Sequence, residues 1–183
     1  ILLFDPERAA ALMDLSEDHF LRLPAAMFDA GAPVVACPVM FANLRLVTPG
    51  LLEKSILPAL SRCFGLSRGP VVFHDGGNRI EDHLHHYAGL PNVPGFVMDP
   101  RDSLSRAREI LGPRRLLLGN LSGPALVRTA PDAARALASE ILAGRSGDRA
   151  FILASGHADV PFDTNPDTLR AVRQAVLDAG AVT

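Results

Sequence analysis

The chain has 183 residues, 48 % of them hydrophobic, which suggests a single globular domain over residues 1–183 with a substantial core. Its net charge of −2 gives no general attraction to nucleic acid, and no segment approaches the ~18 consecutive apolar residues of a membrane span. Two cysteines are too few for a disulfide framework, so the cytoplasm is the expected location.

Helix and strand signals alternate along the chain. In chain order we expect a helix at residues 6–30, a strand at 33–41, a helix at 49–64, a strand at 70–73, a helix at 79–88, a strand at 93–98, a helix at 103–111, a strand at 115–119, a helix at 130–142, a strand at 150–154 and a helix at 168–179. Pro24 and Pro58 predict interruptions in the first two helices. This alternation indicates an α/β fold with a parallel sheet.

The number of repeats leaves two architectures open. Five βα units are fewer than the eight of a closed (β/α)8 barrel. The chain is therefore either a complete open sheet of flavodoxin-like size or the carboxyl-terminal five or so units of a TIM barrel. In both architectures functional groups gather at the carboxyl ends of the strands. The polar residues that follow each strand are thus the candidate site residues.

The second strand run ends in His74-Asp75-Gly76-Gly77-Asn78. Two glycines let the backbone turn sharply and expose the imidazole and the carboxylate that precede them. His74 and Asp75 are therefore candidates for metal ligands or for an acid/base pair. A polar turn without chemistry explains the same residues equally well, because Gly-Gly-Asn is ordinary turn sequence.

A second histidine, His157, follows the last strand run and should reach the same face as His74. Together with Asp75 or Asp159, the two histidines could form a three-ligand metal site with an open position. Four further polar residues near strand ends are candidate substrate-binding groups: Asn43, Asn78, Asp99 and Asn120. Asp99 and Asn120 could equally cap the helices that follow them.

Four stretches resemble the carboxyl-terminal part of the uroporphyrinogen decarboxylase superfamily, which includes that decarboxylase and the cobamide-linked methyltransferases acting on coenzyme M or folate. They are Leu57-Pro58, the tip FHDGGN at residues 73–78, Gly119-Asn120-Leu121 with residues 129–132, and ILASGHADVPFDTNPDTLRAV at residues 152–172. The last stretch is the most specific. The resemblance implies a (β/α)8 barrel whose early strands are not in this chain.

The resemblance also separates two activities at the strand ends. The decarboxylase branch has Gly-His where this chain has Gly156-His157, so His157 would bind a substrate carboxylate, with Asn120 and Asp99 shaping the cleft. The zinc methyltransferases have His-x-Cys at the strand end that corresponds to residues 74–76 and Gly-Cys at the last strand end. This chain keeps His74 but has Gly76 at the position of the first cysteine.

Three functions follow. The leading one is a decarboxylase-like enzyme that acts on a tetrapyrrole-type or related carboxylated small molecule without a cofactor. The second is a methyltransferase working with a corrinoid protein, in which His74 and His157 would hold zinc. The third is a non-catalytic assembly subunit, because open sheet edges need cover. A homodimer is a further candidate assembly, whereas nucleic acid and membrane are not expected partners.

Overall fold

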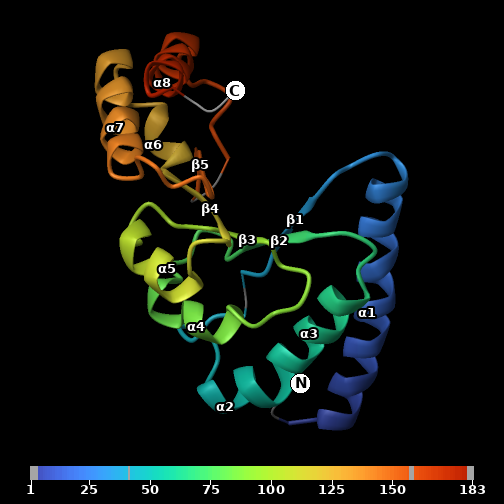
Figure 1. Cartoon of the computed structure of the whole chain (residues 1–183). Helices are drawn as coiled ribbons and strands as arrows, with labels where there is room; N and C mark the ends of the chain where they lie inside the picture. Colours follow the sequence, from blue (N-terminus) through green and yellow to red (C-terminus); the bar gives the residue numbers. More distant parts are fainter. Residues whose placement is uncertain (1–3, 41, 157–158, 181–183) are drawn as a thin grey trace.

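The computed structural model describes residues 4–40, 42–156 and 159–180. Its five strands are all parallel and follow one another across a single sheet in chain order (Figure 1). They are β1 (Val35–Pro38), β2 (Val71–His74), β3 (Gly95–Val97), β4 (Leu116–Leu121) and β5 (Phe151–Ser155). A flavodoxin-like sheet reverses its direction of growth once, whereas a barrel grows one way. The sequential order is therefore that of a partial (β/α)8 barrel.

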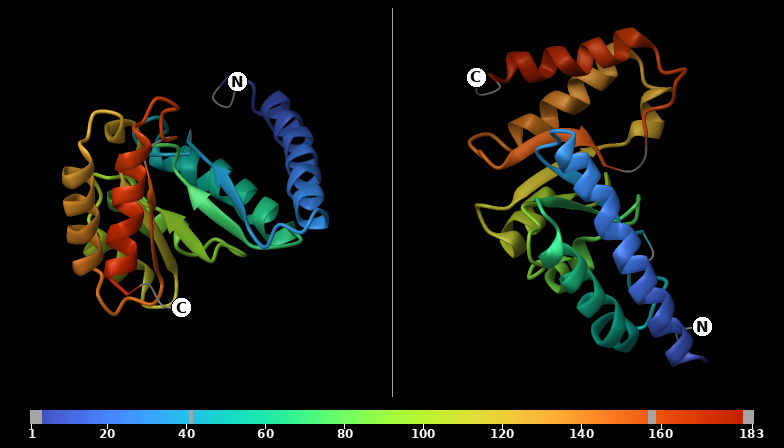
Figure 2. Two further views of the ribbon diagram at one scale, coloured as in Figure 1. Left: turned by 90° about the horizontal axis from the view of Figure 1, so that it is seen from above. Right: turned by 90° about the vertical axis from the view of Figure 1, so that its right-hand side faces the viewer.

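Helices connect the strands and flank the two ends of the sheet. They are α1 (Pro6–Asp29), α2 (Pro49–Leu51), η1 (Leu52–Ile56, a π-helical turn), α3 (Leu57–Leu66), η2 (Glu81–His83, a 3-10 turn), α4 (Leu84–Tyr87), α5 (Leu104–Leu111), α6 (Gly123–Leu126), α7 (Pro131–Ala143) and α8 (Pro166–Asp178). Figure 2 shows α1 at one end of the sheet, and α7 and α8 packed together at the other. When parallel strands follow one another in chain order and the crossovers are right-handed, the connecting helices lie on one face of the sheet.

Two expected helices differ from the structure in instructive ways. The segment expected as one helix is helical throughout, but η1 separates α2 from α3 where Pro58 enters the first turn of α3. Proline has no N–H to donate, and the widened turn before it accommodates that loss. The helix expected at residues 79–88 begins later, because the amides of Ile80 and Glu81 donate to the Asp102 carboxylate instead.

The sheet is strongly curved, because the ends of distant strands meet. The ring nitrogen Nε2 of His74, at the end of β2, lies 3.4 Å from the carbonyl oxygen of Gly156, just after β5. In a flat sheet three strand spacings would separate these strands by roughly 14 Å. The curvature also presses Gly156 against β3: a Cβ atom there would lie 1.8 Å from the Met98 carbonyl oxygen.

The core lies between the sheet and the helices and is rich in aromatic rings. Phe73 of β2 packs at centroid distances of 4.8 Å from Tyr87 and 5.6 Å from Phe96. The Tyr87 hydroxyl donates a hydrogen bond to the carbonyl of Ala42, so this buried ring also anchors the connection after β1. Burial of such rings supplies much of the stability of a domain this size.

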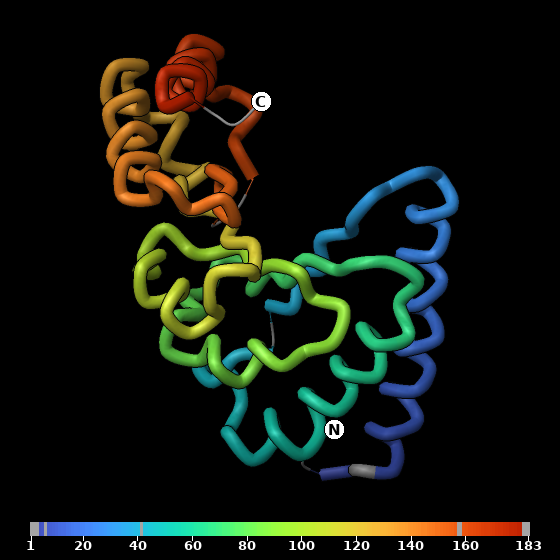
Figure 3. The backbone as a smooth tube through the Cα atoms, viewed as in Figure 1, coloured from blue at the N-terminus to red at the C-terminus, as the bar shows by residue number. Residues whose placement is uncertain are grey.

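Helix α1 lies beside α3, as the backbone trace in Figure 3 shows. Phe20 of α1 packs near Phe64, and Glu17 accepts hydrogen bonds from Arg62. Leu15 and Leu23 of α1 are exposed. Among the described residues, β1 pairs only with β2 and β5 only with β4, so each leaves one edge open. None of the described helices is both long and apolar enough to cross a membrane.

We expect Gly156→Ala to destabilise the fold, because its Cβ would fall 1.8 Å from the Met98 carbonyl oxygen and two strand ends would have to separate. Overpacking of this kind should lower the free energy of unfolding by at least about 2 kcal/mol. Gly50→Ala is the matched control, since a Cβ there meets nothing within 4 Å. Urea denaturation of both variants measures the difference. Equal midpoints would show that β3 and β5 do not approach as closely as described.

Candidate functional site

The carboxyl ends of β2, β3, β4 and β5 form the candidate site. His74 ends β2, Asp99 follows β3, and Asn120 is the second-to-last residue of β4 rather than lying beyond the strand. The contact between His74 and Gly156 brings the β5 end to the same place. The curved sheet therefore gathers residues that are 82 positions apart in sequence.

Asp75 is the most unusual group in the site. Its side chain is buried, at 2 % relative exposure, and within residues 4–40, 42–156 and 159–180 neither carboxylate oxygen has a hydrogen-bond partner. Burial raises the pKa of Asp75 to about 8, with further contributions from Asp102 and Asp99. At neutral pH this carboxyl group is therefore mostly protonated, and it can donate a proton.

The turn after Asp75 is fixed by its own backbone and by Asn78. The Asn78 amide donates to the Asp75 carbonyl at 2.8 Å and to the Met40 carbonyl at 3.2 Å. Gly76 and Gly77 both have positive φ, and a Cβ on Gly76 would lie 2.3 Å from the Met40 Cβ. The glycines thus serve a tight turn, and the same turn holds Asp75 in place.

Asp99 and Asn120 are both engaged in the site. Asp99 is buried and forms an ion pair with Arg101, with 2.6 Å between Nε and Oδ1 and 3.0 Å between Nη2 and Oδ2. The Asn120 amide donates to the backbone carbonyls of Asp99 and Asp102 at 3.1 and 3.0 Å. Asn43 lies in the connection after β1, where its amide closes a local turn with Met40 and Arg45.

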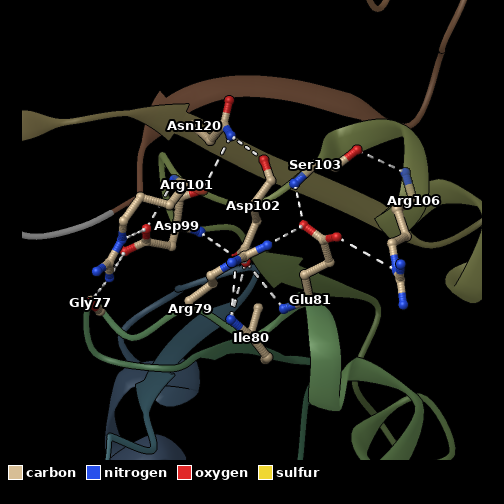
Figure 4. A network of polar contacts seen from close by, with 10 residues as sticks. All are labelled: Gly77, Arg79, Ile80, Glu81, Asp99, Arg101, Asp102, Ser103, Arg106 and Asn120. Atoms are coloured by element: carbon tan, nitrogen blue, oxygen red, sulfur yellow. Dashed lines mark hydrogen bonds and ion pairs between the residues drawn. The ribbon is translucent and has the colours of Figure 1, made fainter.

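A buried acidic residue that the sequence analysis missed, Asp102, lies at the centre of this network (Figure 4). It accepts hydrogen bonds from the backbone amides of Ile80, Glu81 and Asp99. Burial raises the pKa of Asp102, and these three amides oppose that effect. In the sequence, the spacing Asp99-x-x-Asp102 after a strand was the signal for Asp102. That spacing is also typical of the start of a helix, so it does not by itself indicate a buried carboxylate.

Arginine side chains balance the charge of the acidic cluster. Arg79 Nε lies 3.7 Å from Asp102 Oδ1, and Arg79 Nη2 lies 3.6 Å from Glu81 Oε2. In the part of the chain that the structure describes, Arg79 Nε is buried and has no hydrogen-bond partner. Glu81 also accepts from the Ser103 amide at 2.6 Å. Arg79 and Asp75 therefore both keep unused hydrogen-bonding capacity.

The expected metal site involves a residue beyond the described part of the chain. His157 lies outside the described residues, so its distance from His74 is not part of the structure. Among the described residues, no group of three or more His, Cys, Asp or Glu side chains could hold a metal ion. Zinc binding by His74 and His157 therefore stays a prediction, and so does the binding role of His157.

Two comparisons with known proteins each gave a match that covers most of this chain. The family model of uroporphyrinogen decarboxylase (URO-D) matches residues 1–178. A solved structure, a methyltransferase from Methanosarcina mazei, has a TM-score of 0.78 and 26 % sequence identity over 90 % of this chain and 48 % of that chain. This chain thus spans about half the length of that methyltransferase. A search of curated protein sequences gave no match.

We expect Asp75→Asn to remove a pH dependence of stability. The folded-state pKa lies above the ordinary 3.8, so the folded chain holds this proton more tightly, and the resulting stability is lost as pH rises towards about 8. As pH rises from about 5 to about 9, the free energy of unfolding of the variant should therefore increase relative to that of the wild type by a few kcal/mol. Urea denaturation at both pH values measures this. A constant difference between the two proteins would refute the raised pKa.

Proposed function

This chain belongs to the uroporphyrinogen decarboxylase (URO-D) family, and from that premise we propose that it is an enzyme that removes a carboxyl group from a tetrapyrrole-type or related carboxylated molecule. The observation that carries this proposal is the buried carboxyl group of Asp75 at the strand ends, with its pKa raised to about 8. Such a group is a proton donor at neutral pH.

Decarboxylation needs a proton at the carbon that loses carbon dioxide. When the carbon–carboxylate bond breaks, its electron pair stays on the substrate, and a proton must take the place of the carboxylate. Asp75 in its protonated state is suited to deliver that proton from a dry environment. The nearby Asp99 and Asp102 charges favour the return of a proton to Asp75 after each turnover, because they raise its pKa.

Other residues receive roles in substrate binding. A carboxylated substrate needs cationic or hydrogen-bond-donating partners, and Arg79 brings a buried Nε beside the Asp102 carboxylate. We assign His157 and His74 to the substrate carboxylates and Asn78, Asn43, Asp99 and Asn120 to the walls of the cleft. Preorganised charge in a dry pocket would then stabilise the transition state.

The second candidate is methyl transfer between a corrinoid protein and a thiol or folate. The similarity to the methyltransferase from Methanosarcina mazei favours it. In this function His74, Asp75 and His157 would hold zinc, which acts as a Lewis acid and lowers the pKa of a bound thiol. The two candidates thus assign the same tip to different chemistry, and metal content separates them.

The test is a pair of assays on the natural-length protein purified without chelators. Zinc analysis is combined with assays for carbon dioxide release from porphyrinogen substrates and for methyl transfer from methylcobalamin to thiols. Activity on porphyrinogens without bound zinc supports the leading proposal. About one zinc per chain together with methyl transfer supports the second. The absence of both activities in a folded protein would favour the assembly subunit.

For the leading function we expect Asp75→Asn to lower kcat at least about 100-fold while the protein stays folded. Asparagine matches the shape of a protonated aspartate but cannot give up a proton. Wild-type activity should fall as pH rises above about 8, since the donor form of Asp75 is then lost. The exposed Asp82 follows in the same connection, and Asp82→Asn is the control. Full activity in Asp75→Asn would rule out this role for Asp75.

A further inference from the structure

Behind the groups that would meet the substrate, we propose that Asp102 is a positioning residue, whose buried carboxylate clamps the loop that follows β2 and contains Asp75 to the connection after β3. The inference rests on the function proposed above, because it concerns the same site. It assigns no contact with the substrate to Asp102. Its role is to hold Asp75, the proposed proton donor, in place and close to other carboxyl groups.

The clamp consists of three backbone amides on one side chain. Asp102 Oδ1 accepts from the amides of Ile80 at 3.2 Å and Glu81 at 3.1 Å, and Oδ2 accepts from Asp99 at 3.0 Å. The Asp102 side chain is fully buried. One carboxylate therefore joins the connection after β2 to the connection after β3, and charge-assisted bonds of this kind are the stronger class.

Neighbouring side chains extend the clamp on both sides (Figure 4). Asn120 of β4 donates to the carbonyls of Asp99 and Asp102, which ties in a third strand end. Arg101 donates from Nη2 to the Gly77 carbonyl at 3.2 Å, so the glycine turn after Asp75 is held as well. The loop at residues 75–81 is thus fixed at its turn and at its end by the single turn at residues 99–102.

The charge of Asp102 matters in addition to its shape. An ionised carboxylate can accept several hydrogen bonds, whereas an asparagine offers one oxygen and turns an N–H₂ group towards the donors. The Asp102 charge is also one of the causes that raise the pKa of Asp75. In the described part of the chain, the other charged groups of this cluster are Asp99, Glu81, Arg79, Arg101 and Arg106. Asp102→Asn therefore weakens the hold on the loop that contains Asp75.

Asp148 provides a matched control at the amino ends of the strands, opposite the site. It lies just before β5, is largely buried, and accepts from Arg108 at 2.9 and 3.0 Å and from the Ala150 amide at 3.1 Å. Asp148→Asn removes the same charge and a comparable set of hydrogen bonds. It does so away from the carboxyl ends of the strands, so it reproduces a general loss of stability without touching the clamp.

The experiment compares hydrogen exchange of the backbone amides of Ile80, Glu81 and Asp99 in the wild type, Asp102→Asn and Asp148→Asn. In Asp102→Asn we expect these three amides to exchange at least about tenfold faster than in the wild type, because their shared acceptor is lost. In Asp148→Asn their exchange should not change. Unchanged protection of the three amides in a folded Asp102→Asn variant would overturn the proposal.

A measurement on the wild type keeps the proposal testable if Asp102→Asn does not fold. Hydrogen exchange should show the amides of Ile80, Glu81 and Asp99 protected together, because they share one acceptor. Exchange of these three amides at the rate of unprotected peptide would refute the clamp. Neither readout involves catalysis. A failure of the decarboxylase proposal in the activity assays therefore leaves this result standing, and the converse also holds.

Discussion

The contact between Gly156 and the Met98 carbonyl is the constraint on which the rest of the site depends. Only a residue without a side chain allows the end of β5 to come so near the end of β3. The sheet therefore curves, and the ring of His74 reaches the Gly156 carbonyl across two intervening strands. Without that curvature the polar ends of the strands would lie along a line, and His74 could not reach the end of β5.

The curved sheet brings several acidic side chains close together, and these side chains differ in their hydrogen-bonding partners. Asp99 is paired with Arg101, and Asp102 is surrounded by backbone amides. Asp75 receives no comparable hydrogen bond from the described part of the chain, and it holds its proton instead. Three aspartates in one cluster thus have different partners: an arginine side chain for Asp99, backbone amides for Asp102 and, among the described residues, none for the Asp75 side chain.

The local features of this fold were readable from the sequence, whereas the long-range ones were not. Apolar runs located the five described strands, and the helix expected at residues 103–111 matches α5 (Leu104–Leu111), because such signals act over a few residues. The role of Asp102 could not be predicted, since its partners Ile80 and Glu81 lie about twenty positions away and donate through backbone amides of any residue type. The same interaction shortened the helix expected at residues 79–88. His74 and Asp75 stood out because two glycines follow them at the end of an apolar run and let the backbone turn sharply.

The two open edges of the sheet differ in how readily they accept another strand. In β1 the amides of Val35 and Val39 point towards β2, so the residue at position 38 faces the open side, and it is a proline without an N–H group. The edge of β5 contains no proline and carries the half-exposed Ile152. Among the described residues, the open side of β1 therefore lacks one N–H donor, whereas β5 keeps the N–H group of every residue, so those on its open side can pair with a further strand.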